Sequence, residues 1–170
     1  MFYPPNKELG QNFLFDKNYL RKIVASCPVN SSTVIVEIGS GYGSLTNLLA
    51  ETNCQKVINA LTFNWEEFCL KYQNNSIVVV VQKEVGQKWV ASPEKYSSQY
   101  SSLSVFINYL AETNLVFEIP RNVFKPIPKV DGALIIIKPR SETTKEFPNE
   151  QFFPFLRFLK NCFRFRRKTL

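Results

Sequence analysis

The stretch VIVEIGSGYGSLT, Val34 to Thr46, decides the fold of this chain. Its first five residues, Val34–Ile38, are mostly β-branched and apolar, which predicts a strand buried on both faces, as in parallel sheets. Glycines follow at positions 39, 41 and 43, and residues 44–52 have the apolar spacing of a helix. A strand that ends in so bare a loop and leads directly into a helix is typical of an α/β protein that holds a small ligand at the carboxyl end of its sheet.

Length and composition exclude several classes of protein. The chain has 170 residues, which suits one domain, and no run approaches the roughly 18 apolar residues of a membrane span. It has no histidine, and its four cysteines show no C-x-x-C spacing, so a zinc site or a histidine-based triad is excluded and we expect no metal. The N-terminus has no signal or presequence pattern, so we expect reduced thiols, a cytoplasmic location and no membrane partner. We also expect a monomer.

The net charge of +7 is concentrated at the C-terminus, where six basic residues and no acid follow from Arg157 onward. The spacing predicts an amphipathic helix in which Pro154 suits the first turn. Its apolar residues are Phe155, Leu156, Leu159 and Phe163, and its basic residues on a different face are Arg157, Lys160, Arg164 and Lys168. Such a helix is either a solvated face or a contact to a polyanion, and the separation of the two faces favours the polyanion.

The rest of the chain alternates between helix and strand patterns. Asp16 is a plausible N-cap for the first helix. Helices are predicted over residues 17–25, 44–52, 64–72, 82–91 and 103–113, strands over residues 34–38, 56–61, 77–81, 114–120 and 133–139, and loops over residues 92–102 and 121–132. This alternation predicts a mostly parallel sheet flanked by helices.

The spacing of the glycines separates two kinds of cofactor. In the dinucleotide fingerprint the third glycine comes three residues after the second, so that a helix N-terminus faces a pyrophosphate. Here only one residue separates the second and third glycines, and Glu37 stands two residues before the first. This E-x-G-x-G-x-G pattern resembles that of S-adenosylmethionine-dependent methyltransferases. The alternative is a glycine-rich tight turn without a ligand.

Three further stretches resemble the ribosomal RNA adenine dimethyltransferase family. They are KELGQNFLFDKNYLRKIV (residues 7–24), LSVFINYLAETNLVFEIPRNVFKPIPKVDGALIIIKPR (residues 103–140) and FRFRRKTL (residues 163–170). The resemblance covers nearly the whole chain. It implies a Rossmann-like class I methyltransferase sheet, S-adenosylmethionine as cofactor, and dimethylation of two adjacent adenines of small-subunit rRNA in ribosome biogenesis.

The resemblance also implies site residues. Asn12 and Leu14 would line the cofactor pocket, and the loop from Gly39 to Gly41 would pass beneath the methionine part of the cofactor. Asn59 takes the position of the aspartate that binds the cofactor's adenine in the family. The cofactor-binding candidates are thus Asn12, Leu14, Glu37, Gly39, Gly41 and Asn59, and the RNA-binding candidates are Lys125, Lys129, Arg164, Arg166, Arg167 and Lys168.

Two blocks of the family are missing. No acid lies between Glu51 and Glu66, where the family has a strand ending in the acid that binds the cofactor's ribose. The N-L-P-Y tetrapeptide, which in the family holds the target amine and stacks on the flipped adenine, is also missing, so no catalytic residue is identified. Trp65 and Tyr72 lie in the right region, but neither sits in a proline-containing turn after a strand. The chain ends at RRKTL, where the family's small helical domain begins, so that domain is expected to be mostly missing.

These losses affect the expected architecture, because the family's sheet order of 3-2-1-4-5-7-6 would leave strand 34–38 without either neighbour. A repair is available, in which residues 56–59 pair with it in parallel and residues 77–81 approach from the other side. The chain would then close as a five-stranded sheet of reduced strand number. The alternative is a chain that does not fold, and the sequence does not decide between the two. Residues 1–140 would form the methyltransferase-like domain, and residues 141–170 a linker and the basic helix.

Two functions remain open at this stage. The chain is either a methyltransferase with weakened activity or a catalytically inert RNA-binding remnant in ribosome assembly. The segment FKPIPKVD, residues 124–131, is correspondingly either an RNA contact or a rigid loop.

Overall fold

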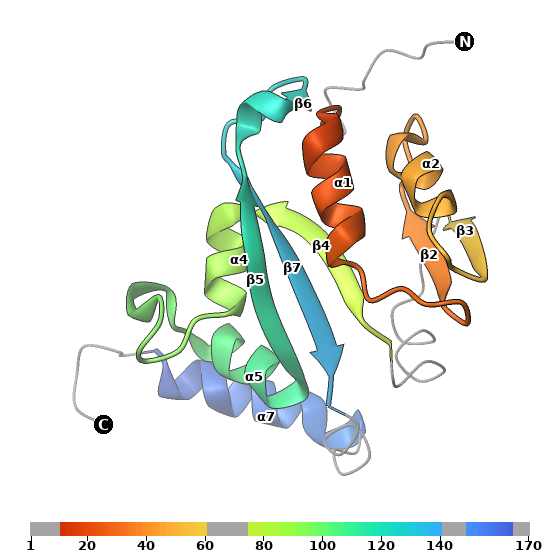
Figure 1. Cartoon of the computed structure of the whole chain (residues 1–170). Helices are drawn as coiled ribbons and strands as arrows, with labels where there is room; N and C mark the ends of the chain where they lie inside the picture. The colour runs from red at the N-terminus through yellow and green to blue at the C-terminus, as the bar shows by residue number, and fades with distance from the viewer. Residues whose placement is uncertain (1–10, 61–74, 141–148, 165–170) are drawn as a thin grey trace. The chain divides into compact units, whose positions relative to one another are not determined.

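The computed structural model describes residues 11–60, 75–140 and 149–164 (Figure 1). The chain divides into two compact units, Met1–Cys69 with Ile119–Gly132, and Leu70–Glu118 with Ala133–Leu170. The described residues form helices and strands in alternation, which confirms the predicted α/β class. The predicted helix over residues 64–72 lies outside the described residues.

The first unit contains the quoted stretch. Its elements are β1 (Phe13–Leu14), α1 (Lys17–Ser26), β2 (Val34–Ile38), α2 (Ser44–Ala50), β3 (Lys56–Ala60) and β6 (Phe124–Lys125). Helix α1 begins as predicted, because the Asp16 carboxylate accepts hydrogen bonds from the backbone N–H groups of Asn18 and Tyr19 at 2.8 and 3.2 Å. Leu20 and Ile23 are buried on its inner face.

Strands β2 and β3 pair in parallel, in a register that runs from Val34 opposite Lys56 to Ile38 opposite Ala60. This confirms the predicted pairing of residues 56–59 with the strand before the glycines. The prediction that β2 is buried on both faces is wrong, since Val34, Val36 and Ile38 are 47%, 39% and 51% exposed. The side chains of a strand alternate between its two faces, and only the face that carries Glu37 is turned toward α2.

The N-terminal arm is held by the proline-rich segment. Strands β1 and β6 pair antiparallel, and the Phe15 N–H donates to the Val123 carbonyl at 3.2 Å. The Arg121 N–H donates to the Asp131 carboxylate at 3.0 Å, and the Arg121 guanidinium donates to the Lys129 carbonyl at 2.8 Å. Residues 121–132 were predicted as one extended loop. They contain a 3₁₀ helix at Arg121–Val123 and strand β6, and the two hydrogen bonds of Arg121 brace the segment internally.

The second unit contains a three-stranded sheet in the order β4-β7-β5, visible beside its helices in Figure 1. Its elements are β4 (Ile77–Gln82), α4 (Lys83–Trp89), α5 (Ser102–Leu110), β5 (Ala111–Ile119), β7 (Gly132–Pro139) and α7 (Asn149–Cys162). The single five-stranded sheet, one of the two outcomes that the sequence left open, does not form within the described ranges, where β2 pairs with β3 and β4 pairs with β7. Local sequence patterns identify strands, but the partner of each strand depends on the rest of the chain.

The core of this unit is built around β7. Leu134 and Ile135 are fully buried. A Cβ on Gly86 would come within 2.9 Å of Ile135 Cδ1 and 3.3 Å of Ala133 Cβ, so this glycine lets α4 lie close against the strand. The buried Ser104 hydroxyl donates to the Lys88 carbonyl at 2.7 Å and links α5 to α4.

Two predicted helix boundaries are wrong. The helix expected over residues 103–113 ends at Leu110, and Ala111 already belongs to β5, because pairing within the sheet overrides a weak local preference. Pro154 is not in the first turn of the last helix, since α7 begins at Asn149 and Pro154 lies inside it. Its missing N–H therefore removes one helical hydrogen bond.

The amphipathic character predicted for α7 is confirmed. Its Phe155 ring lies 6.2 Å from the Phe106 ring and 5.3 Å from the Tyr109 ring of α5, between centroids. Leu159 is buried, whereas Arg157 and Lys160 are exposed. In the part of the chain that the structure describes, no helix is long and apolar enough to cross a membrane.

Candidate cofactor and nucleic-acid sites

The glycine loop joins β2 to α2 in a left-handed conformation. Gly39, Gly41 and Gly43 have φ values of +70°, +55° and +76°, a region that other L-residues rarely adopt. The Gly43 N–H donates to the Ser40 carbonyl at 2.8 Å, and Gly43 is the N-cap of α2. The repeated glycines are thus required by the path of the backbone, whether or not a ligand lies against it.

The surroundings of the first two glycines differ. Among the described residues, no atom lies within 4 Å of a Cβ added at Gly39, so this part of the backbone faces open space between them. A Cβ on Gly41 would lie 2.8 Å from Phe13 Cε1. The Phe13 ring also packs against Tyr42, with 4.6 Å between ring centroids. Gly39 therefore offers a bare backbone surface, and Gly41 lets the Phe13 ring pack against the loop.

Glu37 connects the strand to the helix beyond the loop. Its side chain is almost fully buried, with 9% of the residue exposed, and its carboxylate accepts a hydrogen bond of 2.5 Å from the Thr46 hydroxyl. This bond spans the glycine loop from β2 to α2. Such a link limits the conformations of a loop whose glycines are otherwise permissive.

Asn59 lies directly opposite Glu37 in the parallel β2–β3 ladder. It is exposed and lies one residue before the carboxyl end of β3. Because the carboxyl ends of parallel strands lie at the same edge, this amide belongs to the same edge of the unit as the glycine loop.

Asn12 and Leu14 flank Phe13 on the N-terminal arm. Asn12 is exposed and precedes β1, whereas Leu14 is half-buried within it. Since the Phe13 ring rests on Gly41, the arm reaches the glycine loop. All six cofactor-binding candidates thus belong to the first unit.

The RNA-binding candidates are distributed over both units. Lys125 and Lys129 are exposed on the braced loop of the first unit, and the Lys125 Nζ lies 5.4 Å from the centre of the Phe15 ring. Arg164 is exposed just beyond α7 in the second unit. The candidates Arg166, Arg167 and Lys168 lie outside the described residues, as do Trp65 and Tyr72.

Two residues of the cofactor region were missed in the sequence. Thr46 and Phe13 hold the loop through contacts with Glu37 and Gly41, which are 9 and 28 positions away in the chain. Nothing in the local pattern pairs them. The only available signal for Phe13 is that it stands between two cofactor candidates.

Within the described residues, the thiols and potential metal ligands show no clustering. Cys27, Cys54 and Cys162 are free cysteines, and burial raises the pKa of the Cys27 thiol. Among residues 11–60, 75–140 and 149–164, no group of three cysteine, aspartate or glutamate side chains is placed to hold a metal ion.

Comparison with known proteins decides the family. The family model described as "Ribosomal RNA adenine dimethylase" matches residues 4–61 and 56–170. The chain belongs to this family. It is 30% identical to the ribosomal RNA small subunit methyltransferase A of Streptococcus thermophilus, over 96% of this chain and 74% of that protein. It is 31% identical to the protein of the same name from Maridesulfovibrio salexigens, over 96% of this chain and 79% of that protein.

Solved structures confirm the predicted fold class, a methyltransferase-type α/β fold. A dimethyladenosine transferase from Plasmodium falciparum matches with a TM-score of 0.76 at 22% identity, over 93% of this chain and 73% of that one. The 23S rRNA methyltransferase ErmE matches with a TM-score of 0.61 at 18% identity, over 92% of this chain and 81% of that one.

The alignments also show that this chain is shorter than its relatives within the aligned region. The alignment to the Streptococcus thermophilus relative spans 220 positions, against 170 residues in the whole chain, so at least 50 aligned positions of that protein have no counterpart here. This agrees with the two family blocks that the sequence lacks.

Proposed function

We propose that this chain binds S-adenosylmethionine and small-subunit rRNA in the cytoplasm, and that it transfers methyl groups to adenine far more slowly than relatives that retain the missing blocks. The observation that carries this proposal is the β2–glycine loop–α2 unit. Its backbone at Gly39 faces open space, beside a strand edge that bears polar groups. Family membership supports the choice of cofactor and substrate.

The residues of the first unit fit such a cofactor. S-adenosylmethionine supplies an electrophilic methyl group when it is bound. Gly39 offers an uncovered surface on which the ligand can lie against the backbone, and Asn12 and Leu14 belong to the arm that reaches this loop. The Glu37 carboxylate accepts a hydrogen bond from Thr46. In this proposal Glu37 therefore stabilises the conformation of the loop, in addition to any contact with the ligand.

The β2–β3 ladder supports a changed role for Asn59. In the family's strand order, the strand that ends in the ribose-binding acid lies next to the strand before the glycines. In this chain β3 pairs with β2 directly, which brings Asn59 opposite Glu37. We therefore assign Asn59 to the ribose hydroxyls. A hydrogen bond between neutral groups contributes about 0.5–1.5 kcal/mol, against about 1.5–3 kcal/mol for one to a carboxylate, so binding is expected to be weak.

Calorimetry tests this part of the proposal. The affinity for S-adenosylmethionine should be weaker than low-micromolar, and Asn59→Asp should tighten it by about tenfold, because about 1.4 kcal/mol corresponds to a factor of 10. Asn53→Asp adds the same charge at another exposed asparagine of the first unit and is the matched control. Low-micromolar binding by the natural chain, or equal effects of the two substitutions, would contradict the assignment.

The slow methyl transfer follows from positioning. The lone pair of the adenine amine is delocalised into the ring, so a clamp must hold the amine in line with the methyl group. The proline-containing clamp of the family is missing from this sequence. Since a misplacement of about 1 Å already costs about 100-fold, we expect a single-turnover rate at least about 100-fold below that of a relative with the clamp.

The decisive assay is methyl incorporation into undermethylated small ribosomal subunits, with mass spectrometry to identify dimethyladenine. Trace incorporation at the expected slow rate supports the proposal. Stoichiometric dimethylation at a relative's rate would refute the predicted loss. RNA binding without any incorporation would instead establish the alternative, an inert protein of ribosome assembly that uses its basic helix and the braced loop.

A further inference from the structure

The N-terminal arm, residues 12–15, contacts the glycine loop through one aromatic ring. An added Cβ on Gly41 would lie 2.8 Å from Cε1 and 2.9 Å from Cδ1 of Phe13, so the ring of Phe13 lies directly on this part of the backbone. The same ring packs against Tyr42, with 4.6 Å between ring centroids. The conformation of the loop and the position of the Phe13 ring therefore depend on each other.

The same arm is paired with the segment that carries the RNA-binding candidates of the first unit. Phe13 lies opposite Lys125 in the antiparallel β1–β6 ladder. The Phe15 N–H donates to the Val123 carbonyl at 3.2 Å, and the Lys125 Nζ lies 5.4 Å from the centre of the Phe15 ring. Three consecutive residues of the arm thus connect the glycine loop to Lys125, and all of them belong to the first unit.

Both ends of this connection are structures that a ligand can stabilise. Strands β1 and β6 contain two residues each, and a two-stranded ladder is only marginally stable by itself. The loop contains three glycines of positive φ, whose backbone has many accessible conformations in the absence of a ligand. A ligand that lies against Gly39 restricts the loop and, through the contact of Phe13 with Gly41, it also restricts the arm. The conformational entropy of the arm is then already lost when a second ligand binds to β6, which favours that second binding.

We propose that Phe13 is a positioning residue that couples cofactor binding to RNA binding. A cofactor on the glycine loop fixes the Phe13 ring, and the arm then holds β6 and Lys125 in the arrangement that contacts RNA. The proposal rests on the proposed function for its two ligands and adds the coupling between them. Because such coupling is reciprocal, RNA tightens cofactor binding by the same factor as the cofactor tightens RNA binding.

Hydrogen exchange tests the connection in the absence of RNA. The probe is S-adenosylhomocysteine, which has no methyl group to transfer. When the probe is saturating, the amides of residues 121–125 should exchange about fivefold more slowly, although none of the cofactor candidates belongs to this segment. Phe13→Leu should abolish the protection, whereas Phe13→Tyr retains the ring and should preserve it. Tyr19→Leu removes another half-buried ring of the first unit and should also preserve it.

The affinity ratio with and without RNA distinguishes coupling from simple packing. Equilibrium dialysis measures the affinity for radiolabelled S-adenosylhomocysteine alone and with saturating undermethylated small ribosomal subunits. In the natural chain the subunits should tighten binding by about fivefold or more. Phe13→Leu should bring the ratio of the two affinities close to one. A ring that only packs would weaken both affinities when it is removed, and the ratio would not change.

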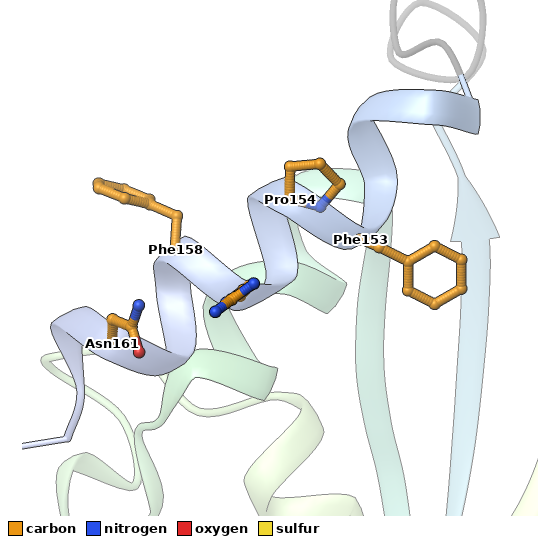
Figure 2. Close-up of a pocket in the computed structure, with 5 residues that line it drawn as sticks. Phe153, Pro154, Phe158 and Asn161 are labelled. Carbon is orange, nitrogen blue, oxygen red and sulfur yellow. The ribbon is translucent and has the colours of Figure 1, made fainter.

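Arg157→Gln is the control for a change in RNA affinity alone. Arg157 lines an open hollow on α7 in the second unit, together with Phe153, Pro154, Phe158 and Asn161 (Figure 2). Loss of its charge should weaken binding to the ribosomal subunits, because fewer phosphates are neutralised. The affinity ratio for S-adenosylhomocysteine at saturating subunits should remain that of the natural chain.

The outcomes that overturn the coupling differ from those that overturn the proposed function. Binding of S-adenosylhomocysteine without slower exchange over residues 121–125, or a ratio near one in the natural chain, would refute the coupling and leave the proposed function intact. An unchanged ratio in Phe13→Leu would refute the assignment to Phe13. Failure of the natural chain to bind the probe would refute the proposed function and the coupling together. If circular dichroism shows that Phe13→Leu does not fold, the two measurements on the natural chain still decide.

Discussion

Gly39→Ala and Gly41→Ala are expected to lower the free energy of unfolding by different amounts, and the difference isolates the contact of the Phe13 ring with Gly41. Both glycines have positive φ, so an alanine at either position incurs the strain of a left-handed conformation, about 1–2 kcal/mol. At Gly39 no atom of the residues that the structure describes lies within 4 Å of the added Cβ, so backbone strain is the expected effect on stability. At Gly41 the added Cβ lies 2.8 Å from Phe13 Cε1, so the ring must move.

The additional cost at Gly41 follows from the displacement of Phe13. When the ring moves, its packing against Tyr42 at 4.6 Å is disturbed, and an aromatic pair of this kind contributes about 0.5–1.5 kcal/mol. We therefore expect Gly41→Ala to lower the free energy of unfolding by about 1.5–3.5 kcal/mol, against about 1–2 kcal/mol for Gly39→Ala. For a chain of this size, each 1 kcal/mol corresponds to about 2–4 °C in Tm.

The assay is urea unfolding followed by circular dichroism, repeated in a Phe13→Leu background. Removing the ring removes the overlap, so Gly41→Ala should then cost about as much as Gly39→Ala. Calorimetry adds a second readout, because Gly39→Ala should weaken S-adenosylmethionine binding despite its smaller effect on stability. Equal destabilisation by the two substitutions in the natural background, or no rescue in the Phe13→Leu background, would refute the reasoning.

Three further predictions concern other parts of the chain. Thr46→Val should lower the free energy of unfolding by about 1–3 kcal/mol, because it leaves the buried Glu37 carboxylate without its hydroxyl donor, whereas Thr46→Ser should be nearly neutral in urea unfolding. The raised pKa of Cys27 lowers the fraction of its thiolate, so peptide mapping at pH 8 should find Cys27 alkylated more slowly than exposed Cys162. The alkylation rate of Cys27 should still rise with pH above the ordinary thiol pKa, and equal rates for the two cysteines would contradict the prediction. Deleting residues 164–170 should flatten the salt dependence of RNA binding by about 0.7 for each phosphate that these residues neutralise, and an unchanged slope would show that they are only solvated.

The glycine loop illustrates what a local pattern predicts well. Its strand, its glycines and its helix follow one another within the stretch Val34 to Thr46, and each is specified by its own residues. The Asp16 cap and the two faces of α7 were likewise predictable, because capping and helical spacing depend on residues a few positions apart. The same reasoning failed at Ala111, where sheet pairing decides between strand and helix, and at Pro154, where the helix begins earlier than its apolar spacing indicates.

The family motifs in the sequence predicted which residues belong to the cofactor region, but they did not predict the tertiary contacts that position these residues. Asn12, Leu14 and the glycines were identified one by one. The contact of Phe13 with Gly41 joins segments 28 positions apart, and it depends on β1 pairing with β6 more than 100 positions away. No periodicity within a short window contains such information.

The sequence by itself determined the α/β class, the family and the shortened form of this chain, because these depend on residue order, motif spacing and missing blocks. Only the tertiary structure decided which strands pair, why one face of β2 stays exposed, and which of two similar glycines carries an aromatic ring. The physical reason is that strand pairing and burial depend on contacts between distant segments, whereas helix caps, turns and amphipathic spacing are set by neighbours in the chain.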